Sequence, residues 1–209
     1  MPEQFSFPGF EEPAPAPLAA AKGKTSAPAV PKGERAPYSL FFSIFPGEAD
    51  AEALAHLAGT LRTEHGLTGK PLLPHRLHVT LHDLGGYTEL PQEIVSAAMR
   101  AGDALAFDAF EVVFDSALSY PSSGTYVLSG DAGTYQLVAF HQALGDAMRD
   151  QGLRVKRGFT PHMTLVYDRH PVAKHPIEPM RWVAQEFVLI KSHVGKGLYD
   201  LLGRWPLQV

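Results

Sequence analysis

The sequence predicts an α+β fold of two lobes, in which two mostly antiparallel β-sheets face a central cleft and the helices lie outside. Two observations predict this class. Strand-like and helix-like segments interleave with short connections from residue 38 onward, without a linker-like break. The tetrapeptide His-x-Thr-Leu also occurs twice, at residues 78–81 and 162–165, in corresponding settings of strands and a helix. This loose duplication indicates a pseudo-two-fold relation that would bring the two motifs together.

Composition limits the classes of protein to consider. The 209 residues, 45% of them hydrophobic, suffice for one well-cored domain or two small lobes. Because the chain has no cysteine, disulfides, thiolate metal sites and a cysteine nucleophile are excluded. The formal net charge of -4 argues against holding long nucleic acid by bulk electrostatics. A local basic site for a nucleic-acid end or a small nucleotide remains open.

The first 37 residues have the composition of a flexible tail. They are rich in proline and alanine and lack a periodic apolar face, so we assign residues 1–37 as a tail and 38–209 as the folded domain. Phe5, Phe7 and Phe10 leave open whether the tail has no specific role or docks in a groove. With no signal-peptide pattern and no apolar run of about 18 residues, we expect a cytoplasmic monomer without a membrane contact.

The first predicted elements lead into the first motif. Residues 38–45 are aromatic and β-branched, which indicates a buried strand. Residues 48–66 place alanine and leucine at helical spacing and predict a helix that stops at a glycine. Residues 76–84 alternate strictly and predict a strand with two different faces. Its polar face carries His78, Thr80 and His82, and its apolar face carries Leu77, Val79 and Leu81.

The middle of the chain predicts two helices around three strands. Apolar residues at helical spacing predict a helix over residues 90–106. Strands follow at residues 107–114, 116–120 and 125–129, the last after a Pro-Ser-Ser-Gly turn. Residues 135–151 again have helical spacing and stop at Gly152, so they predict a third helix, whose lone His141 would serve packing or lie at the surface.

The second motif lies on the next predicted strand. After a short basic segment at residues 154–158, alternation over residues 162–167 places His162, Thr164 and Val166 opposite Met163, Leu165 and Tyr167. A proline-interrupted stretch at residues 171–179 comes next. Residues 186–190 then predict a strand, and residues 198–206 predict a last strand or a turn.

Two imidazoles and two hydroxyls suit in-line displacement at a phosphodiester, above all a strained cyclic one. A neutral imidazole takes a proton from the attacking water while a protonated one gives a proton to the leaving sugar oxygen, and a pKa of about 6.5 lets both forms coexist near neutrality. Each threonine hydroxyl can donate a hydrogen bond to a phosphate oxygen. We therefore predict His78 and His162 as catalytic, Thr80 and Thr164 as substrate-binding, and no metal or other cofactor.

Two alternative sites compete with this hypothesis. A metal shell is disfavoured because His75 has the wrong strand parity and no carboxylate recurs beside both motifs. Its candidate ligands would be His75, His78, His82, His162 and His170. A serine hydrolase is disfavoured because the sequence contains no Gly-x-Ser-x-Gly nucleophile elbow.

In these motifs the chain resembles the two-histidine phosphoesterase superfamily, and within it the RNA 2′,3′-cyclic phosphodiesterases also called 2′-5′ RNA ligases. The matching stretches run in family order over the whole body of the chain, at residues 40–46, 76–81 with 84–85, 159–165 and 199–207. The resemblance implies a bilobal fold, no metal, and hydrolysis of 2′,3′-cyclic phosphates at RNA ends or on small nucleotides to 2′-phosphomonoesters. RNA ligation would be a side activity.

The resemblance also implies roles that the residues alone leave open. It makes His78 the proton donor and His162 the acceptor that activates water, with Thr80 and Thr164 holding the phosphate. The pattern of residues supports an acid and a base without assigning them.

The sequence departs from the family after the second motif. Family members often have a run like His-x-Thr-Leu-x-Arg, whereas this chain has Tyr167 at that place. Arg169 has strand parity opposite to His162 and would reach the phosphate only through a bulge. We predict Tyr167 and Arg157 as substrate-binding residues, with Lys156 or Arg76 as other sources of positive charge. Tyr167, Phe42 and Phe159 would each either stack on a base or pack in the core.

Two functions therefore compete. The first is a phosphodiesterase that acts on RNA ends or cyclic nucleotides. The second is a nucleotide- or RNA-end-binding module of the same fold with little activity, which the missing arginine and the acidic net charge would favour.

Overall fold

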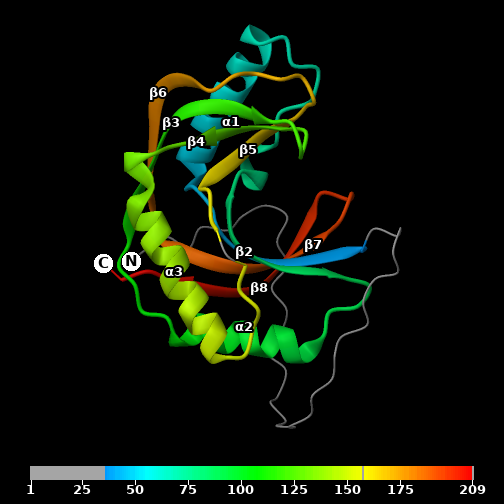
Figure 1. Ribbon diagram of the computed structural model, residues 1–209, viewed down its shortest axis with the longest axis vertical. Helices are drawn as coiled ribbons and strands as arrows, with labels where there is room; N and C mark the ends of the chain where they lie inside the picture. Colours follow the sequence, from blue (N-terminus) through cyan, green and yellow to red (C-terminus); the bar gives the residue numbers. More distant parts are fainter. Residues whose placement is uncertain (1–35, 157, 209) are drawn as a thin grey trace.

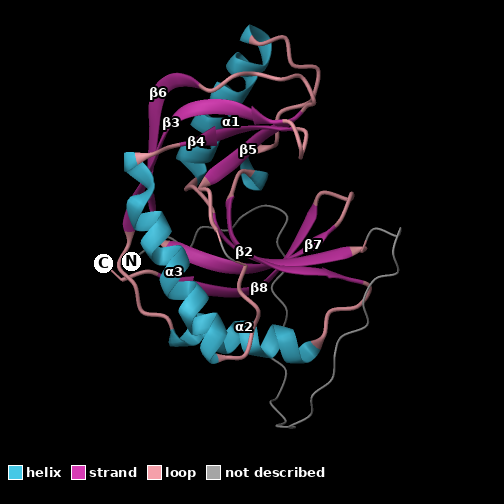
Figure 2. Cartoon of the chain, in the orientation of Figure 1, coloured by secondary structure: helices cyan, strands magenta, loops and turns pink. Residues whose placement is uncertain are grey.

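The structure, a computed structural model, describes residues 36–156 and 158–208, which form eight strands, three α-helices and two short 3-10 helices (Figures 1 and 2). The strands are β1 (Tyr38–Ile44), β2 (Val79–Tyr87), β3 (Phe110–Tyr120), β4 (Thr125–Ser129), β5 (His162–Tyr167), β6 (His175–Ala184), β7 (Glu186–His193) and β8 (Leu198–Pro206). The helices are α1 (Glu48–Glu64), α2 (Gln92–Ala104), α3 (Tyr135–Asp150), η1 (Pro74–Arg76) and η2 (Ala132–Thr134).

The strands form two four-stranded sheets in which every pairing is antiparallel. The first sheet has the order β2-β1-β7-β8 and combines strands from both ends of the described chain. The second has the order β5-β4-β3-β6 and comes from its middle. In Figure 1 the sheets lie one above the other, with α1 outside the second sheet and α2 outside the first. The predicted α+β class, with two antiparallel sheets and helices outside, is confirmed.

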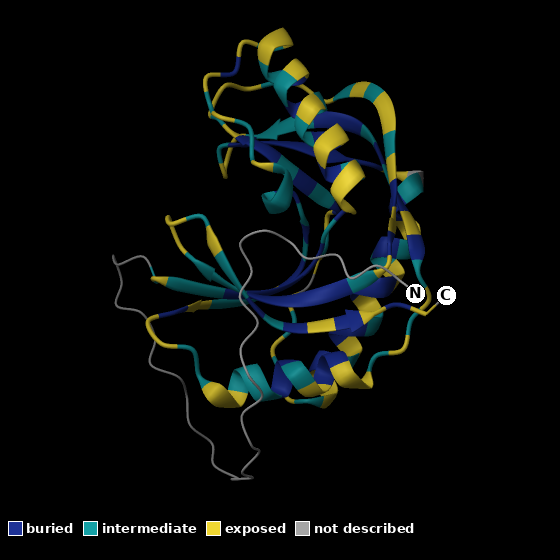
Figure 3. Cartoon of the chain, turned by 180° about the vertical axis from the view of Figure 1, so that it is seen from behind, coloured by how far each residue is buried: buried dark blue, intermediate teal, exposed yellow. Residues whose placement is uncertain are grey.

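The helices join the two sheets into one core. Helix α1 packs on β5 and β6 of the second sheet although it directly follows β1 in the chain, while α2 packs on β8 and α3 contacts both β2 and β3. One hydrophobic cluster consequently runs through both sheets and all three α-helices. Figure 3 shows this core as dark strand centres beneath helices whose outer sides are exposed. Its largest fully buried side chains are Tyr126, Phe42, Phe114, Phe140 and Phe187.

Strand β6 is absent from the sequence-based prediction, which expects a proline-interrupted connection there. Proline has no N–H to donate to a neighbouring strand, so Pro176 and Pro179 argue against a strand. However, β6 lies at the edge of its sheet and pairs only with β3, where one side of the strand needs no ladder hydrogen bonds. The prolines are therefore tolerated.

Two further boundaries differ from prediction. Residues 76–78 are not part of a strand, because Pro74 begins the turn η1 and β2 starts only at Val79. The two strands expected at residues 107–114 and 116–120 are one strand, β3, whose pairing with β6 shifts in register between Phe114 and Ser116. The alternation of the sequence is interrupted at this shift in register, and the interruption predicts a break between two strands.

Residues 1–35 of the expected tail, with its three phenylalanines, lie outside the described residues, so the assignment of residues 1–37 stays a prediction. Within the described ranges, no helix combines the length and apolar character needed to cross a membrane.

Candidate active site

The two motif histidines are anchored in the same way. Nδ1 of His78 lies 2.7 Å from the carbonyl oxygen of Arg76, and Nδ1 of His162 lies 2.8 Å from that of Thr160. Because a carbonyl oxygen can only accept, each Nδ1 must donate its proton. Nε2 is then the basic nitrogen of each neutral ring, and it bonds to no residue in the described ranges. Both imidazoles can thus exchange a proton at Nε2.

A β-bulge follows the threonine of each motif. In β2 the extra residue is Leu81, because the residues on its two sides pair with consecutive residues of β1. In β5 the extra residue is Leu165, for the same reason in its pairing with β4. An extra residue reverses the face that the following side chains occupy. The strict alternation expected along both motif strands therefore ends at these leucines.

The bulges correct three predicted orientations. The alternation places His82 beside His78, but His82 is only 3% exposed and packs against Gly145 of α3, on the helix-covered side of the sheet. It likewise places Val166 with His162, but Val166 is fully buried in the core. Tyr167, expected on the opposite face, is 59% exposed. The polar face of each motif thus consists of one histidine and one threonine.

His78 is enclosed by aromatic rings. Phe41 stacks on it with ring centroids 5.4 Å apart, Phe45 lies at 5.4 Å, and Tyr199 meets it edge-on at 5.8 Å. Burial among these rings, together with smaller effects of the charges of Arg76 and His162, lowers the pKa of His78 to about 4. The influence of His162 shows that the two imidazoles lie within electrostatic range of each other. In the free protein, His78 is therefore neutral at pH 7.

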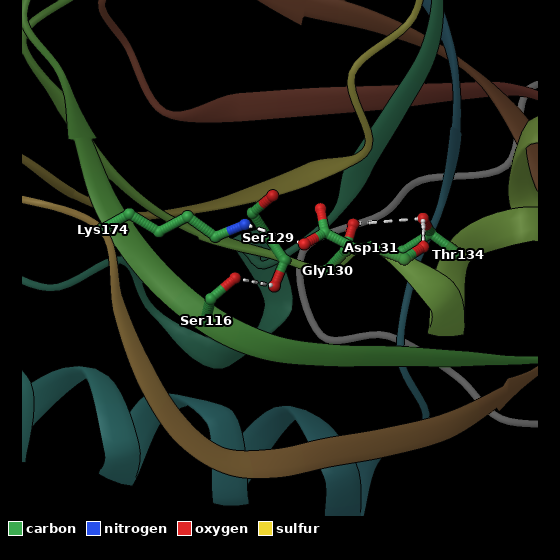
Figure 4. A network of polar contacts seen from close by, with 6 residues as sticks. All are labelled: Ser116, Ser129, Gly130, Asp131, Thr134 and Lys174. Atoms are coloured by element: carbon green, nitrogen blue, oxygen red, sulfur yellow. Dashed lines mark hydrogen bonds and ion pairs between the residues drawn. The ribbon is translucent and has the colours of Figure 1, made fainter.

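His162 has a more open setting, and the strand beside it is fixed by polar contacts. The ring of Tyr120 meets His162 edge-on at 5.4 Å, and Ser129 is its partner on β4. Figure 4 shows how β4 ends. Ser116 donates to the carbonyl oxygen of Ser129 at 3.0 Å, and Lys174 pairs with Asp131 at 3.0 Å. Thr134 donates to the carbonyl oxygens of the turn, Gly130 at 3.2 Å and Asp131 at 2.9 Å.

The threonines of the motifs keep their hydroxyls available. Thr80 and Thr164 are both half-buried, and neither hydroxyl makes a hydrogen bond to a residue in the described part of the chain. By contrast, Ser43 of β1, the pairing partner of Thr80, donates from its hydroxyl to the carbonyl oxygen of Val79 at 2.9 Å. The two free hydroxyls therefore have the capacity to donate to a ligand placed between the strands.

Tyr167 is the last residue of β5 in the second sheet and also lies near residues of the first sheet. Partial burial and the neighbouring Tyr199 of the first sheet raise the pKa of the Tyr167 phenol, while the charge of Arg76 lowers it. The chain after Tyr167 is held by Asp168, which accepts hydrogen bonds from the backbone of Thr68 and Gly69 at 2.7 and 2.8 Å. A bond from the backbone of His170, together with these two, holds the pKa of the Asp168 carboxyl well below its usual range. Tyr167 thus stands at a fixed point beside an open pocket of about 490 Å³.

The other predicted sources of positive charge separate in the structure. Arg157 lies outside the described residues, so its role in substrate binding stays a prediction. Lys156 pairs with Asp83 at the surface. Arg169 is exposed and lies against Gly124 in the β3–β4 turn, whereas Arg76 lies close to His78 and Tyr167.

Sequence reasoning did not find the aromatic residues around the histidines. Phe41 and Phe45 belong to a predicted buried strand, where alternation against Phe42 was the only signal that some of its side chains face the other way. Tyr199 and Tyr120 come from distant strands. Fold, rather than local pattern, brings all four to the site.

His82 takes part in a second histidine cluster behind the site. Its ring stacks on His141 of α3 at 3.9 Å, and its Nε2 donates to the carbonyl oxygen of His141 at 2.8 Å. His141 in turn stacks on Phe159 at 4.1 Å, just before the second motif. This three-ring stack, which confirms a packing role for His141, connects the strand of the first motif to the segment that leads into the second. Phe159 is thus part of this packing.

The stack predicts a stability that depends on pH. Burial lowers the pKa of His82, and it lowers that of His141 to about 4, so the unfolded chain binds more protons than the folded one between pH of about 6.5 and 4. The free energy of unfolding should therefore fall as the pH is lowered through this window, and this contribution should be constant above it. Replacing His141 by Phe keeps the stack and should flatten the slope by up to about 1.4 kcal/mol per pH unit, the value for one proton.

Urea titrations of the wild-type protein and of His141→Phe at several pH values would measure this slope. His56 is exposed on α1, so His56→Phe serves as the control and should leave the slope unchanged. An identical slope in the wild type and His141→Phe would contradict the assignment.

The metal-shell alternative finds little geometric support. His82 lies on the other side of the sheet from His78, which removes one of its five candidate ligands. Among the described residues, no three His, Asp or Glu side chains are grouped so that they could hold a metal ion.

Comparison with known proteins yields consistent matches. A family model described as the 2′-5′ RNA ligase superfamily matches residues 45–195. The RNA 2′,3′-cyclic phosphodiesterase of Thermus thermophilus is 26% identical over 185 residues, which cover 81% of this chain and 90% of that protein. A solved structure described as a phosphoesterase has a TM-score of 0.69 and 25% identity, covering 83% of this chain and 99% of that one. E. coli LigT complexed with NADP+ has a TM-score of 0.64 and 26% identity, again covering 83% and 99%.

Proposed function

Since the chain belongs to the 2′-5′ RNA ligase superfamily, we propose that it is a metal-independent phosphodiesterase that hydrolyses 2′,3′-cyclic phosphates at RNA ends or on nucleotides. The product is a 2′-phosphomonoester. The name of the Thermus thermophilus relative supports this activity, and the complex of E. coli LigT with NADP+ supports a nucleotide as ligand.

One observation carries the proposal. Two imidazoles, His78 just before β2 and His162 at the start of β5, are oriented by equivalent bonds from Nδ1 to a backbone carbonyl, which leaves both Nε2 atoms for proton transfer. Each imidazole is accompanied by a threonine hydroxyl without a protein partner in the described ranges. An acid, a base and two donors for phosphate oxygens are the groups that the reaction needs.

The reaction then proceeds by in-line displacement. One neutral imidazole accepts a proton at Nε2 from water, and the water oxygen forms a bond to phosphorus. The bond between phosphorus and the 3′ oxygen breaks, and the second, protonated imidazole gives its Nε2 proton to that oxygen. Thr80 and Thr164 donate hydrogen bonds to the non-bridging oxygens as negative charge grows on them. Exchange with solvent restores both imidazoles.

The family resemblance makes His78 the proton donor and His162 the acceptor. A donor must be protonated, but the pKa of His78 in the free protein is about 4. A bound phosphate brings negative charge next to the ring and raises this pKa, so His78 takes up its proton as substrate binds. Under the opposite assignment, the neutral His78 of the free protein is already the base.

Hydrolysis is tested with purified protein and the four nucleoside 2′,3′-cyclic phosphates in the presence of a chelator. We expect turnover that the chelator does not reduce, with a product identified by phosphorus NMR as the 2′-phosphomonoester. If none of the four nucleoside 2′,3′-cyclic phosphates is hydrolysed, the proposal is contradicted.

A second candidate is a nucleotide-binding module of the same fold with little activity. Tyr167 favours this second candidate, because a neutral side chain stands here at a position where members of the family often carry arginine. Binding of a cyclic nucleotide without hydrolysis, measured in the same samples by calorimetry, would support this candidate, whereas turnover would exclude it. Incubation of RNA ends with the protein tests 2′-5′ ligation as a side activity.

A further inference from the structure

Arg76 is a half-buried cation without a carboxylate partner among the described residues. Its Nη2 donates to the hydroxyl of Tyr199 at a long 3.4 Å, and its Cζ lies 5.3 Å from the centroid of the Tyr199 ring. Its Nε is buried and has no hydrogen-bond partner in the structure. A guanidinium has five N–H donors, and removing it from water is unfavourable unless an anion or acceptors replace the water. The side chain therefore lacks a partner of negative charge.

The nearby carboxylates are occupied elsewhere. Asp200, next to Tyr199, accepts from Lys191 and His193, both at 2.9 Å. Asp168, next to Tyr167, accepts from the backbone of Thr68 and Gly69. Neither pairs with Arg76, so its charge is not compensated by the carboxylates nearby in the described part of the chain.

The guanidinium lies where the two sheets meet. Its Nη1 lies against Gly197 in the β7–β8 turn of the first sheet, 3.2 Å from the place that a Cβ would occupy if this residue were not glycine. Its charge lowers the pKa of His78, which follows two residues later in the chain, and that of Tyr167 in the second sheet. Tyr199 contacts both Arg76 and His78 with the same ring. The unpartnered cation thus stands next to the proposed reaction centre rather than at a remote surface.

We propose that Arg76, steadied by Tyr199, binds a phosphate group of the substrate beside His78 and His162. A guanidinium matches the geometry of phosphate oxygens by two parallel hydrogen bonds, and its charge stabilises the anion more strongly in a partly buried site than in water. The proposal deepens the proposed function and rests on it. The phosphate is either the reacting cyclic one or the phosphodiester that links the next nucleotide of an RNA end.

The position of Arg76 also couples binding to proton transfer. While the site is empty, the cation opposes protonation of His78. A bound phosphate compensates the charge of Arg76 and allows His78 to take up a proton. Arg76 and His78 thus respond to the same anion.

The test compares Arg76→Met, which keeps the unbranched apolar stem but not the charged guanidinium, with Arg76→Lys, which keeps a positive charge. We expect kcat/KM for a dinucleotide that ends in a 2′,3′-cyclic phosphate, which carries both candidate phosphates, to fall by about 10²–10³-fold in Arg76→Met, the usual effect of removing one preorganised donor to an anion. Arg76→Lys should recover part of it, and methylguanidinium added to Arg76→Ala should restore activity in part. Arg100 is exposed on α2, where it bonds to Gln151, so Arg100→Met is the control and should retain wild-type activity.

Two readouts separate binding from a merely structural role. The pKa of His78, followed by NMR in the phosphate-free protein, should rise in Arg76→Met, because a cation has been removed. The affinity for inorganic phosphate, measured by calorimetry, should fall about 10-fold or more, which corresponds to 1.4 kcal/mol. Unchanged kcat/KM and unchanged phosphate affinity in a folded Arg76→Met variant would overturn the proposal.

A mononucleotide and a dinucleotide that ends in a cyclic phosphate identify which phosphate is bound. An equal loss with both substrates assigns Arg76 to the reacting phosphate, and a loss confined to the dinucleotide assigns it to the linking phosphodiester. If the wild-type protein hydrolyses neither, the proposed function fails. Phosphate affinity still decides the role of Arg76 in that case, since it must fall in Arg76→Met for the inference to stand.

Discussion

Replacing either His78 or His162 by asparagine should lower kcat for 2′,3′-cyclic nucleotides by about 10²–10⁴-fold, the usual contribution of a general acid or base. Asparagine can place its amide nitrogen near the position of Nδ1 and keep the bond to the carbonyl of Arg76 or Thr160. It removes the outer part of the ring, including Nε2, the atom proposed to move the proton. KM should change much less than kcat, because the interaction lost is one made in the transition state.

Steady-state kinetics of both variants, with His56→Asn as the control on the exposed side of α1, would measure this effect. An acyclic diester, bis(4-nitrophenyl) phosphate, then distinguishes the acid from the base. Its 4-nitrophenolate leaves without a proton, so loss of the acid should cost far less with this substrate than with the cyclic one, whereas loss of the base should cost about as much with both. Full activity of either variant on cyclic nucleotides would contradict the His/His mechanism.

Thr80→Val and Thr164→Val should each lower kcat by about 10²–10³-fold, the magnitude that follows removal of a single preorganised donor to a developing oxyanion. Valine keeps the shape and β-branching of threonine, so the strand and its packing are retained while one hydrogen bond to the phosphate is lost. Because both hydroxyls lack a partner among the described residues, their removal should not destabilise the fold.

Serine variants provide the matched comparison, since Thr80→Ser and Thr164→Ser keep the hydroxyl and should retain most of the activity. Thr60→Val, on the exposed side of α1, should behave like the wild type in both kcat and melting temperature. If the valine variants of the motif threonines remain fully active, the phosphate must be held by other groups.

The fold class was accessible from the sequence because it depends on local patterns. Alternation and helical spacing indicate most elements, and two similar motifs in similar surroundings indicate two comparable lobes. The strand β6 was not accessible, because its prolines are acceptable only at the edge of a sheet, and position within a sheet is a property of the whole fold. The packing of α1 on the second sheet likewise has no local signal.

The candidate site shows the same division. The spacing of two residues within each motif predicts that His78 lies with Thr80, and His162 with Thr164, on one face of the chain. Beyond the threonines the prediction is wrong, because each bulge depends on how two strands pair. One signal was present in the second motif, where Leu165 and Val166 are consecutive apolar residues that an alternating strand does not explain. In the first motif the polar His82 hid the same irregularity.

The core shared by the two sheets has a consequence for the entropy of catalysis. Moving the sheets apart would expose apolar surface of the cluster that includes strands of both and all three α-helices. The freedom of the two imidazoles relative to each other is therefore lost when the chain folds, not when substrate arrives. An enzyme that must close two loose lobes uses part of its binding energy to restrict that motion. In the proposed reaction, the contacts made with a nucleotide therefore remain available to favour the transition state.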